Sequence, residues 1–298
     1  MTEVRVRGRF APSPTGPLHF GSLVAAVGSF LSAKAQGGEW LVRIEDLDPP
    51  REAAGASDDI LRTLEAYGFE WDGEVLYQSR RADAYEAALE TLRRVGALYP
   101  CACTRGEIAD SSLLGIEGPV YPGTCRGGLA AGRRARSLRV RTDGALIEFK
   151  DRLQGAQRSQ LDREIGDFVV RRADGCFAYQ LAVVVDDAGQ GITEVVRGAD
   201  LLASTARQIH LQRLLGFPTP DYLHLPAALN AQGEKLSKQT RAEPLPRDRP
   251  VAPLWRALVF LGQNPPPEWQ AARVDEFWRM ALARWKREAI PGCFGQTV

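Results

Sequence analysis

The stretch RFAPSPTGPLHFGSL, residues 9–23, joins a strand-like segment to a helix-like segment. Residues 4–10 alternate as a β-strand does, and an apolar helical pattern begins at about Gly21 and runs to Ala35. The loop between them is rich in proline and glycine and carries His19. This order of strand, loop and helix predicts the start of a parallel α/β sheet, in which ligands bind beyond the carboxyl ends of the strands.

Later segments continue the alternation of strands and helices. We predict strands at 40–46, 178–187 and 191–198, and helices at about 57–67, 80–95 and 201–216. The predicted fold is therefore a Rossmann-like parallel-sheet catalytic domain of the α/β class.

The composition of the sequence changes at Tyr99. Glycine, cysteine and arginine become frequent there, and short segments of alternating polar and apolar residues follow. This indicates an inserted α+β subdomain that interrupts the Rossmann-like domain. Short helical patterns occur near 252–262 and 274–287. The expected parts are the first half of the catalytic domain, the insert, the second half of the catalytic domain and a short helical C-terminal segment, at 1–98, 99–177, 178–240 and 241–298.

Composition is that of an ordinary globular protein, with 44% hydrophobic and 25% charged residues in 298. Only five of the 38 basic residues are lysines, and the excess of arginine gives weak support for an RNA partner. The N-terminus has no apolar core of signal-peptide length, and no apolar stretch is long enough to cross a bilayer. We expect a cytoplasmic monomer that does not contact membranes.

His19 lies where a helix N-terminus offers free N–H groups to an anion, and Gly16 and Gly21 let the backbone approach a ligand. Far downstream, the segment GEKLSKQ places Lys235 and Lys238 in a predicted loop. Two ammonium groups and an imidazole suit a triphosphate. The alternatives are a histidine that only caps a helix and a solvated pair of lysines.

These two segments carry a family resemblance. RFAPSPTGPLHFGSL resembles the HIGH region of class I aminoacyl-tRNA synthetases, and KLSKQ resembles their KMSKS loop. The strand LVRIEDLD and the segment VVDDAGQGITEVVRGADLL are similar to glutamyl-tRNA synthetases, so the resemblance covers roughly residues 5–240. Phe20, Ser22, Leu236 and Gln239 depart from the usual motif residues.

The resemblance implies a ligase-type enzyme that binds ATP with Mg²⁺ and cleaves it to AMP and pyrophosphate. It implies that the ATP-binding residues are His19, Gly21, Ser22, Lys235, Ser237 and Lys238. Within this set, the expected catalytic residues are His19, Lys235 and Lys238, with His19 on the α-phosphate and Lys238 on the departing pyrophosphate. Because little covalent chemistry falls to the protein, positioning and charge stabilisation should dominate the rate.

A glutamate site must neutralise two carboxylates and satisfy an ammonium group. The resemblance implies that Arg9 and Arg197 bind carboxylate and that Glu45 binds the ammonium group, with Ser13 and Tyr179 as further contacts. Each residue alone is as easily part of a surface salt bridge, but all are expected at loop or strand ends that converge. Another acidic substrate, such as aspartate, stays open.

The five cysteines are odd in number and unevenly spaced, which favours metal binding over disulfides. The thiolates of Cys101, Cys103 and Cys125 suit zinc, and the alternative is three buried free cysteines. From the residues alone, the fourth ligand is Tyr121, Glu107, Glu117, Cys176 or water. The resemblance favours Tyr121 and implies one structural zinc in a small knob that faces RNA.

Five arginines crowd into nine residues near this cluster, at 133, 134, 136, 139 and 141. They form either a phosphate-binding patch or a solvated face. Only 59 residues follow Gln239, too few for a separate anticodon-reading domain of ordinary size.

This combination resembles the glutamyl-Q tRNA(Asp) synthetases, a family that activates glutamate without tRNA and transfers it to queuosine in the anticodon loop of tRNA(Asp). Two alternatives stay open. One is a truncated glutamyl-tRNA synthetase that charges the 3′ end of tRNA(Glu), and the other is a non-catalytic RNA-binding relative.

Overall fold

The computed structural model describes residues 5–109, 114–115, 118–236 and 243–298. Its centre is a parallel sheet in the order β1 (Arg7–Phe10), β2 (Glu39–Ile44) and β3 (Leu76–Tyr77). A second parallel pair, β11 (Glu194–Gly198) and β12 (Asp221–Leu225), lies alongside β1, where the N–H of Thr193 donates to the carbonyl of Arg7 at 2.9 Å. The predicted parallel α/β sheet is thereby confirmed.

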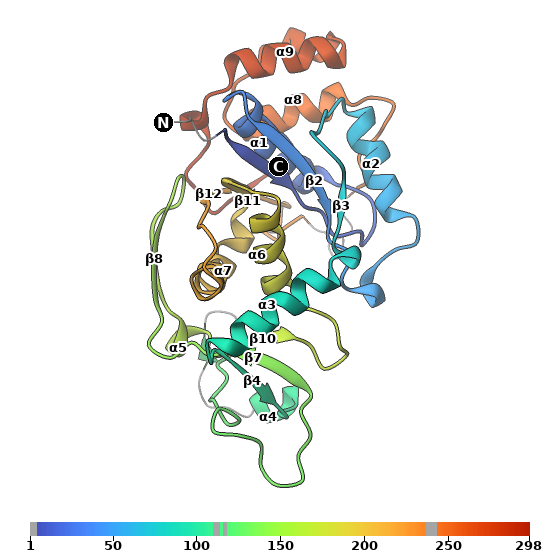
Figure 1. Ribbon diagram of the computed structural model, residues 1–298. Coiled ribbons are helices and arrows are strands. Elements are labelled where there is room, and N and C mark those ends of the chain that lie inside the picture. The colour runs from blue at the N-terminus through green and yellow to red at the C-terminus, as the bar shows by residue number, and fades with distance from the viewer. Residues whose placement is uncertain (1–4, 110–113, 116–117, 237–242) are drawn as a thin grey trace.

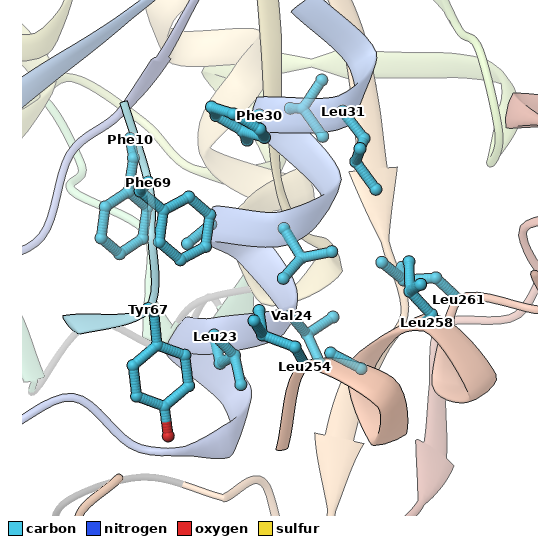
Figure 2. Packing of buried hydrophobic residues seen from close by; sticks show 14 of the residues in the cluster. Phe10, Leu23, Val24, Phe30, Leu31, Tyr67, Phe69, Leu254, Leu258 and Leu261 are labelled. Atoms are coloured by element: carbon cyan, nitrogen blue, oxygen red, sulfur yellow. The ribbon is translucent and has the colours of Figure 1, made fainter. Parts of the chain in front are cut away.

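Helix α1 (Phe20–Lys34) packs against both parts of the sheet and against α8 (Val251–Phe260). Its residues from Leu23 to Ala33 are buried apart from Ala25, which explains why it shows no clear polar face. Figure 2 shows Phe10 and Phe69 to one side of α1, and Leu258 and Leu261 at the end of α8 to the other. This large apolar core fixes the sheet edge from which the candidate site projects.

Three further helices follow the predicted ranges closely. They are α2 (Ala56–Ala66), α3 (Ala82–Arg94) and α7 (Leu202–Leu215), with short 3₁₀ turns η1 (Pro49–Arg51), η2 (Gln78–Arg80) and η3 (Ala199–Leu201). Strand β13 (Ala227–Leu229) leads toward the lysine segment.

The predicted strand at 178–187 is wrong, because this segment is the helix α6 (Tyr179–Gly189). Every residue from Leu181 to Asp187 is buried, so the helix has no polar stripe over this stretch. A short, continuously apolar run does not distinguish a buried strand from a buried helix. Tyr179 therefore begins a helix and not a strand.

The segment predicted to be an insert forms an antiparallel sheet in the order β10 (Phe168–Arg171), β7 (Ser137–Val140) and β4 (Leu98–Cys101), at the lower end of the molecule in Figure 1. Around it lie α4 (Arg105–Ala109), β5 (Leu114–Gly115), β6 (Gly118–Pro119) and α5 (Leu161–Glu164). The long hairpin of β8 (Leu146–Asp151) and β9 (Gly155–Gln160) reaches back to β12, where Arg152 donates its N–H to the carbonyl of Tyr222 at 2.8 Å.

The C-terminal segment packs onto α1. Besides α8 it contains η4 (Pro267–Ala271), α9 (Val274–Arg284) and η5 (Arg287–Ala289). Its last strand, β14 (Gly295–Thr297), pairs in parallel with β13, which the sequence did not predict. We keep the division at 98, 177 and 240 as a proposal for how the chain is organised. Across the described ranges, every helix is too short or too polar to span a bilayer.

Candidate active site

A cleft of about 600 Å³ opens at the carboxyl ends of β1, β2, β11 and β12. Its volume is in the range of small-molecule sites. Among the residues that line it are nine of the predicted site residues: Arg9, Ser13, His19, Gly21, Ser22, Glu45, Tyr179, Arg197 and Lys235. Ser237 and Lys238 lie outside the described residues.

His19 is the N-cap of α1, and its side chain also lines the cleft. Its Nδ1 accepts the N–H groups of Gly21 at 3.1 Å and Ser22 at 3.4 Å, while Ser22 Oγ accepts the N–H of His19 at 2.8 Å. Because Nδ1 is an acceptor, the proton of the neutral ring lies on Nε2. The histidine thus caps the helix through Nδ1 and carries a hydrogen-bond donor at Nε2.

The segment that contains Lys235 lies beside the His19 loop. The N–H of Leu236 donates to the carbonyl oxygen of Ala228 at 2.7 Å. Leu236 also lies close to Gly21, because a Cβ added to Gly21 would be 3.4 Å from the carbonyl oxygen of Leu236. Lys235 Nζ lies 2.5 Å from Asp200 Oδ2. Two segments more than 200 residues apart in the chain therefore share one cleft.

On the β1 and β2 side of the cleft, cations and carboxylates alternate. Asp187 Oδ1 lies 3.2 Å from Arg9 Nε and 2.8 Å from an Arg43 terminal nitrogen. Glu45 Oε1 lies 3.3 Å from the other terminal nitrogen of Arg43. The two carboxylates balance the two guanidinium groups, and all four side chains are buried.

The pKa values of these two carboxylates shift in opposite directions, although burial favours the neutral form of both. Burial raises the pKa of Glu45, although Arg43 and Arg9 oppose the shift. Burial also favours the neutral form of Asp187, but the charges of Arg9 and Arg43 outweigh it and hold the pKa of Asp187 below its ordinary value. Asp187 therefore stays ionised between the two arginines.

On the β11 and β12 side, Arg197 is held by neutral groups. Its Nε donates to His224 Nε2 at 3.0 Å, and one terminal nitrogen donates to Thr205 Oγ1 at 2.9 Å. Its other terminal nitrogen, NH1, is buried and has no hydrogen-bond partner in the described part of the chain. Such a nitrogen is suited to an incoming carboxylate.

Sequence reasoning gave no role to Arg43, Asp187, His224 or Thr205. Arg43 stands inside the LVRIEDLD strand and Asp187 in the VVDD segment, both of which the family resemblance includes. His224 is one of only three histidines in the chain, which was the available signal for it.

The cysteine cluster lies in the insert, away from the cleft. The sulfurs of Cys101, Cys103 and Cys125 all lie within 4.8 Å of one another, and those of Cys103 and Cys125 are 3.7 Å apart. A tetrahedral zinc–thiolate site places its sulfurs about 3.8 Å apart, from Zn–S bonds of about 2.3 Å. Tyr121 Oη lies 3.4 Å from the sulfur of Cys101 and 3.7 Å from that of Cys103. This donor set fits zinc.

The other candidate ligands are engaged or lie elsewhere. The carboxylate of Glu107 accepts from Arg133 at 2.6 Å and from the N–H of Thr104 at 2.6 Å, and Cys176 is not part of the cluster. Glu117 is outside the described residues. Burial opposes ionisation of Cys101, but hydrogen bonding to Tyr121, to the N–H of Cys103 and to Arg139 outweighs it and lowers the pKa to about 7.

The arginine cluster near the cysteines divides in two. Arg139 is buried, with its guanidinium 3.9 Å from the centroid of the Tyr121 ring, and Arg133 pairs with Glu107. Arg134 and Arg136 are exposed. Part of the cluster therefore supports the cysteine knob, and part faces solvent.

The family of tRNA synthetases class I (E and Q), catalytic domain, matches residues 5–281. The parallel sheet with a cleft at its carboxyl edge therefore belongs to a class I tRNA synthetase catalytic domain. A protein of Dechloromonas aromatica named glutamyl-Q tRNA(Asp) synthetase is 63% identical over 96% of this chain and 95% of its own length. One of the same name from Aromatoleum aromaticum is 60% identical over 95% of this chain and 90% of its own. The chain belongs to this family, the glutamyl-Q tRNA(Asp) synthetases.

Solved structures give the same fold. A glutamate tRNA ligase from Elizabethkingia meningosepticum, solved with its amino acid, superposes with a TM-score of 0.79 over 98% of this chain and 67% of that one. At 24% identity, this likeness shows the fold alone.

Proposed function

We propose that this protein activates L-glutamate with ATP, without tRNA, and transfers the glutamyl group to queuosine in the anticodon loop of tRNA(Asp). The observation that carries the proposal is the shared cleft, which joins a histidine at a helix N-terminus, a lysine segment and an uncompensated arginine. The names of relatives that match almost the entire chain support the choice of amino acid and RNA.

In the activation step, an oxygen of the glutamate α-carboxylate attacks the α-phosphorus of ATP. The bond from that phosphorus to the bridging oxygen breaks, and pyrophosphate leaves with the electron pair. His19 Nε2 donates to the α-phosphate, and Lys235 with Lys238 stabilises the departing pyrophosphate. Mg²⁺ enters with ATP as part of the substrate and offsets phosphate charge.

The amino acid is held by the opposite ends of the cleft. Glu45 faces the ammonium group, and Arg197 NH1 faces a carboxylate of the substrate. Arg9, Ser13 and Tyr179 complete the pocket. In the transfer step, a queuosine hydroxyl attacks the glutamyl carbonyl carbon. The bond from this carbon to the phosphate oxygen breaks, AMP leaves with the electron pair, and the hydroxyl proton passes to the departing phosphate.

The direct test of the function uses labelled glutamate with tRNA(Asp) that contains or lacks queuosine and, in a parallel reaction, with tRNA(Glu). Nuclease mapping should find the label on an anticodon-loop fragment, and only when queuosine is present. Label on the terminal adenosine of tRNA(Glu) would support a truncated glutamyl-tRNA synthetase instead, and an absence of glutamate-dependent pyrophosphate exchange would support a non-catalytic relative.

The role of His19 can be separated from its helix cap. His19→Ala should slow ATP–pyrophosphate exchange by about 100-fold, the usual effect of losing one positioned donor. His19→Asn is the matched control, because asparagine can cap α1 but has no donor at the level of Nε2. If His19→Asn restored exchange, the histidine would act only as a cap.

We also propose one structural zinc held by Cys101, Cys103, Tyr121 and Cys125, in support of the knob that faces RNA. Metal analysis of carefully purified protein should give one equivalent, and Co²⁺ substitution should give thiolate-to-metal absorption that Cys125→Ser weakens. Less than half an equivalent of metal would favour three free cysteines.

The exposed Arg134 and Arg136 are proposed to bind RNA phosphates. Their joint replacement by glutamine should lower RNA affinity and reduce the slope of affinity against salt by about two. Arg158→Gln and Arg163→Gln, at arginines outside this cluster, serve as the matched pair. Equal losses from both pairs would indicate a general charge effect.

A further inference from the structure

A buried chain of three side chains runs from the cleft to the β8–β9 hairpin. Arg197 Nε lies 3.0 Å from His224 Nε2, and His224 Nδ1 lies 2.6 Å from Asp151 Oδ2. Exposed fractions are 5% for Arg197, 0% for His224 and 1% for Asp151. Water therefore does not compete for these contacts, and each must be satisfied by the next group.

The arginine determines the tautomer of the histidine. Because a guanidinium nitrogen only donates, His224 Nε2 must accept, so the ring proton lies on Nδ1 and is donated to Asp151. Burial and the charge of Arg197 lower the pKa of His224 to about 4, although the bond to Asp151 opposes them. The ring is neutral at pH 7.

Asp151 is itself fixed by the backbone. Its Oδ1 accepts the N–H groups of Leu153 at 2.9 Å and Gln154 at 2.8 Å, in the turn between β8 and β9. Its Oδ2 is left to face His224. The hairpin turn thus sets the orientation of the carboxylate, and the carboxylate sets that of the ring.

A neutral imidazole orients an arginine without cancelling its charge. Arg9, on the other side of the cleft, contacts the carboxylate of Asp187, whereas Arg197 has no carboxylate partner within the described ranges. His224 and Thr205 fix two of its nitrogens, and NH1 remains for a ligand. A carboxylate in the place of His224 would orient Arg197 equally well but would weaken its attraction for an acidic substrate.

We propose that Asp151 and His224 are positioning residues that hold Arg197 toward the substrate carboxylate with its full charge. Neither residue contacts the cleft itself. This inference rests on the proposed function, because it takes the ligand of Arg197 to be glutamate.

The substitution Asp151→Asn tests this chain of hydrogen bonds, because it leaves the shape of the side chain almost unchanged. The N–H groups of Leu153 and Gln154 require an oxygen at their position, so the new amide must turn its NH₂ toward His224 Nδ1. The ring must then accept at Nδ1 and carry its proton on Nε2, where it opposes the Nε–H of Arg197. The variant keeps the turn but reverses the tautomer.

We expect Asp151→Asn to raise the KM for glutamate in pyrophosphate exchange by about 10- to 100-fold, the usual range for a hydrogen bond to a charged group. The KM for ATP should change less than about twofold. In a His224→Gln background, where the amide oxygen can face Arg197 at the level of Nε2, Asp151→Asn should have no further effect on the KM for glutamate. ¹⁵N NMR of the imidazole should find the proton on Nδ1 in the wild type and on Nε2 in Asp151→Asn.

Several results would overturn the inference while the proposed function stands: wild-type exchange with an unchanged KM for glutamate in Asp151→Asn, an equal rise of both KM values, or a wild-type proton on Nε2. An equal effect of Asp151→Asn in both backgrounds would also overturn it. Wild-type protein with no glutamate-dependent exchange would overturn the proposed function and this inference together.

Discussion

The two walls of the cleft differ in the charge of the groups that contact their arginines. On the β1 wall, formed by Arg9, Arg43, Glu45 and Asp187, every cation contacts a carboxylate. On the β11 wall, the partners of Arg197 within the described ranges are all neutral: it donates to His224, Thr205 and a backbone carbonyl, and its guanidinium lies over the ring of Tyr222. The difference separates two tasks, because paired charges hold the wall in shape whereas an unpaired cation is ready for a ligand.

This contrast has energetic consequences. Removing one partner of a buried ion pair leaves an uncompensated charge, which costs much more than the pair itself contributes. Removing a cation that has only neutral partners leaves no stranded charge. Substitution of Arg43, which does not line the cleft, should therefore mainly reduce stability, and substitution of Arg197 should mainly reduce substrate binding.

The largest effect is expected for Arg43→Met on the β1 wall. Asp187 would keep only Arg9, and Glu45 would lose its ion-pair partner, so the free energy of unfolding should fall by about 3–5 kcal/mol. Urea denaturation followed by circular dichroism measures this loss. Arg197→Met is the matched variant on the β11 wall, and equal losses of stability from the two would contradict the comparison.

Arg197→Met should have the opposite profile. We expect kcat/KM for glutamate to fall by about 100- to 1000-fold, about 3–4 kcal/mol, because a substrate carboxylate would lose its charge-assisted partner. The free energy of unfolding should stay within about 1 kcal/mol of the wild type, since no buried carboxylate is stranded. The KM for ATP is the internal control, and an equal loss of ATP binding would indicate general damage to the cleft.

The two walls also differ in how far the sequence predicts them. Arg9, Glu45 and Arg197 stand at strand ends within recognisable motifs, and the structure places all three at the cleft. The partners that distinguish the walls arise from tertiary contacts: Asp151 and His224 are 73 residues apart, and Arg43 is buried in a strand whose alternation gives no sign of its ion pairs. Local pattern carries no information about such contacts.

The error at 178–187 has the same origin. Helix α6 is enclosed by α3, α7 and β10, so it has no face that must be polar. A polar face is the pattern by which a helix is recognised in a sequence, and α6 lacks it. The pairing of β14 with β13 was likewise missed, because a three-residue strand has too few residues to show a period.

The neutral histidine of the β11 wall predicts a pH effect on stability. The pKa of His224 is about 4 in the folded state against about 6.5 in the unfolded chain, so the unfolded state binds the proton first as the pH falls. Stability is complete above pH 6.5 and is lost progressively down to pH 4. Between pH 7.5 and pH 5, this residue should lower the free energy of unfolding by about 2 kcal/mol.

His224→Gln isolates this contribution, because glutamine does not titrate. Urea titrations at pH 7.5 and pH 5 should show a smaller decline for the variant than for the wild type, by about 2 kcal/mol. His210, whose pKa burial also lowers, is present in both proteins and cancels in the comparison. Parallel pH profiles for the two proteins would show that folding does not lower the pKa of His224.

The smallest effect is expected at Thr205, the second neutral partner of Arg197. Thr205→Val keeps the shape of the side chain but removes the oxygen that accepts from Arg197 at 2.9 Å. Because His224 still holds Nε, the guanidinium should lose only part of its orientation, and the KM for glutamate should rise about fivefold, about 1 kcal/mol. Thr63→Val is a matched control, since Thr63 is also a buried helical threonine, bonded to the carbonyl of Asp59 and remote from the cleft. If the two variants changed the KM for glutamate equally, the neutral contacts of the β11 wall would serve packing alone, and the availability of Arg197 would have to come from the position of its backbone.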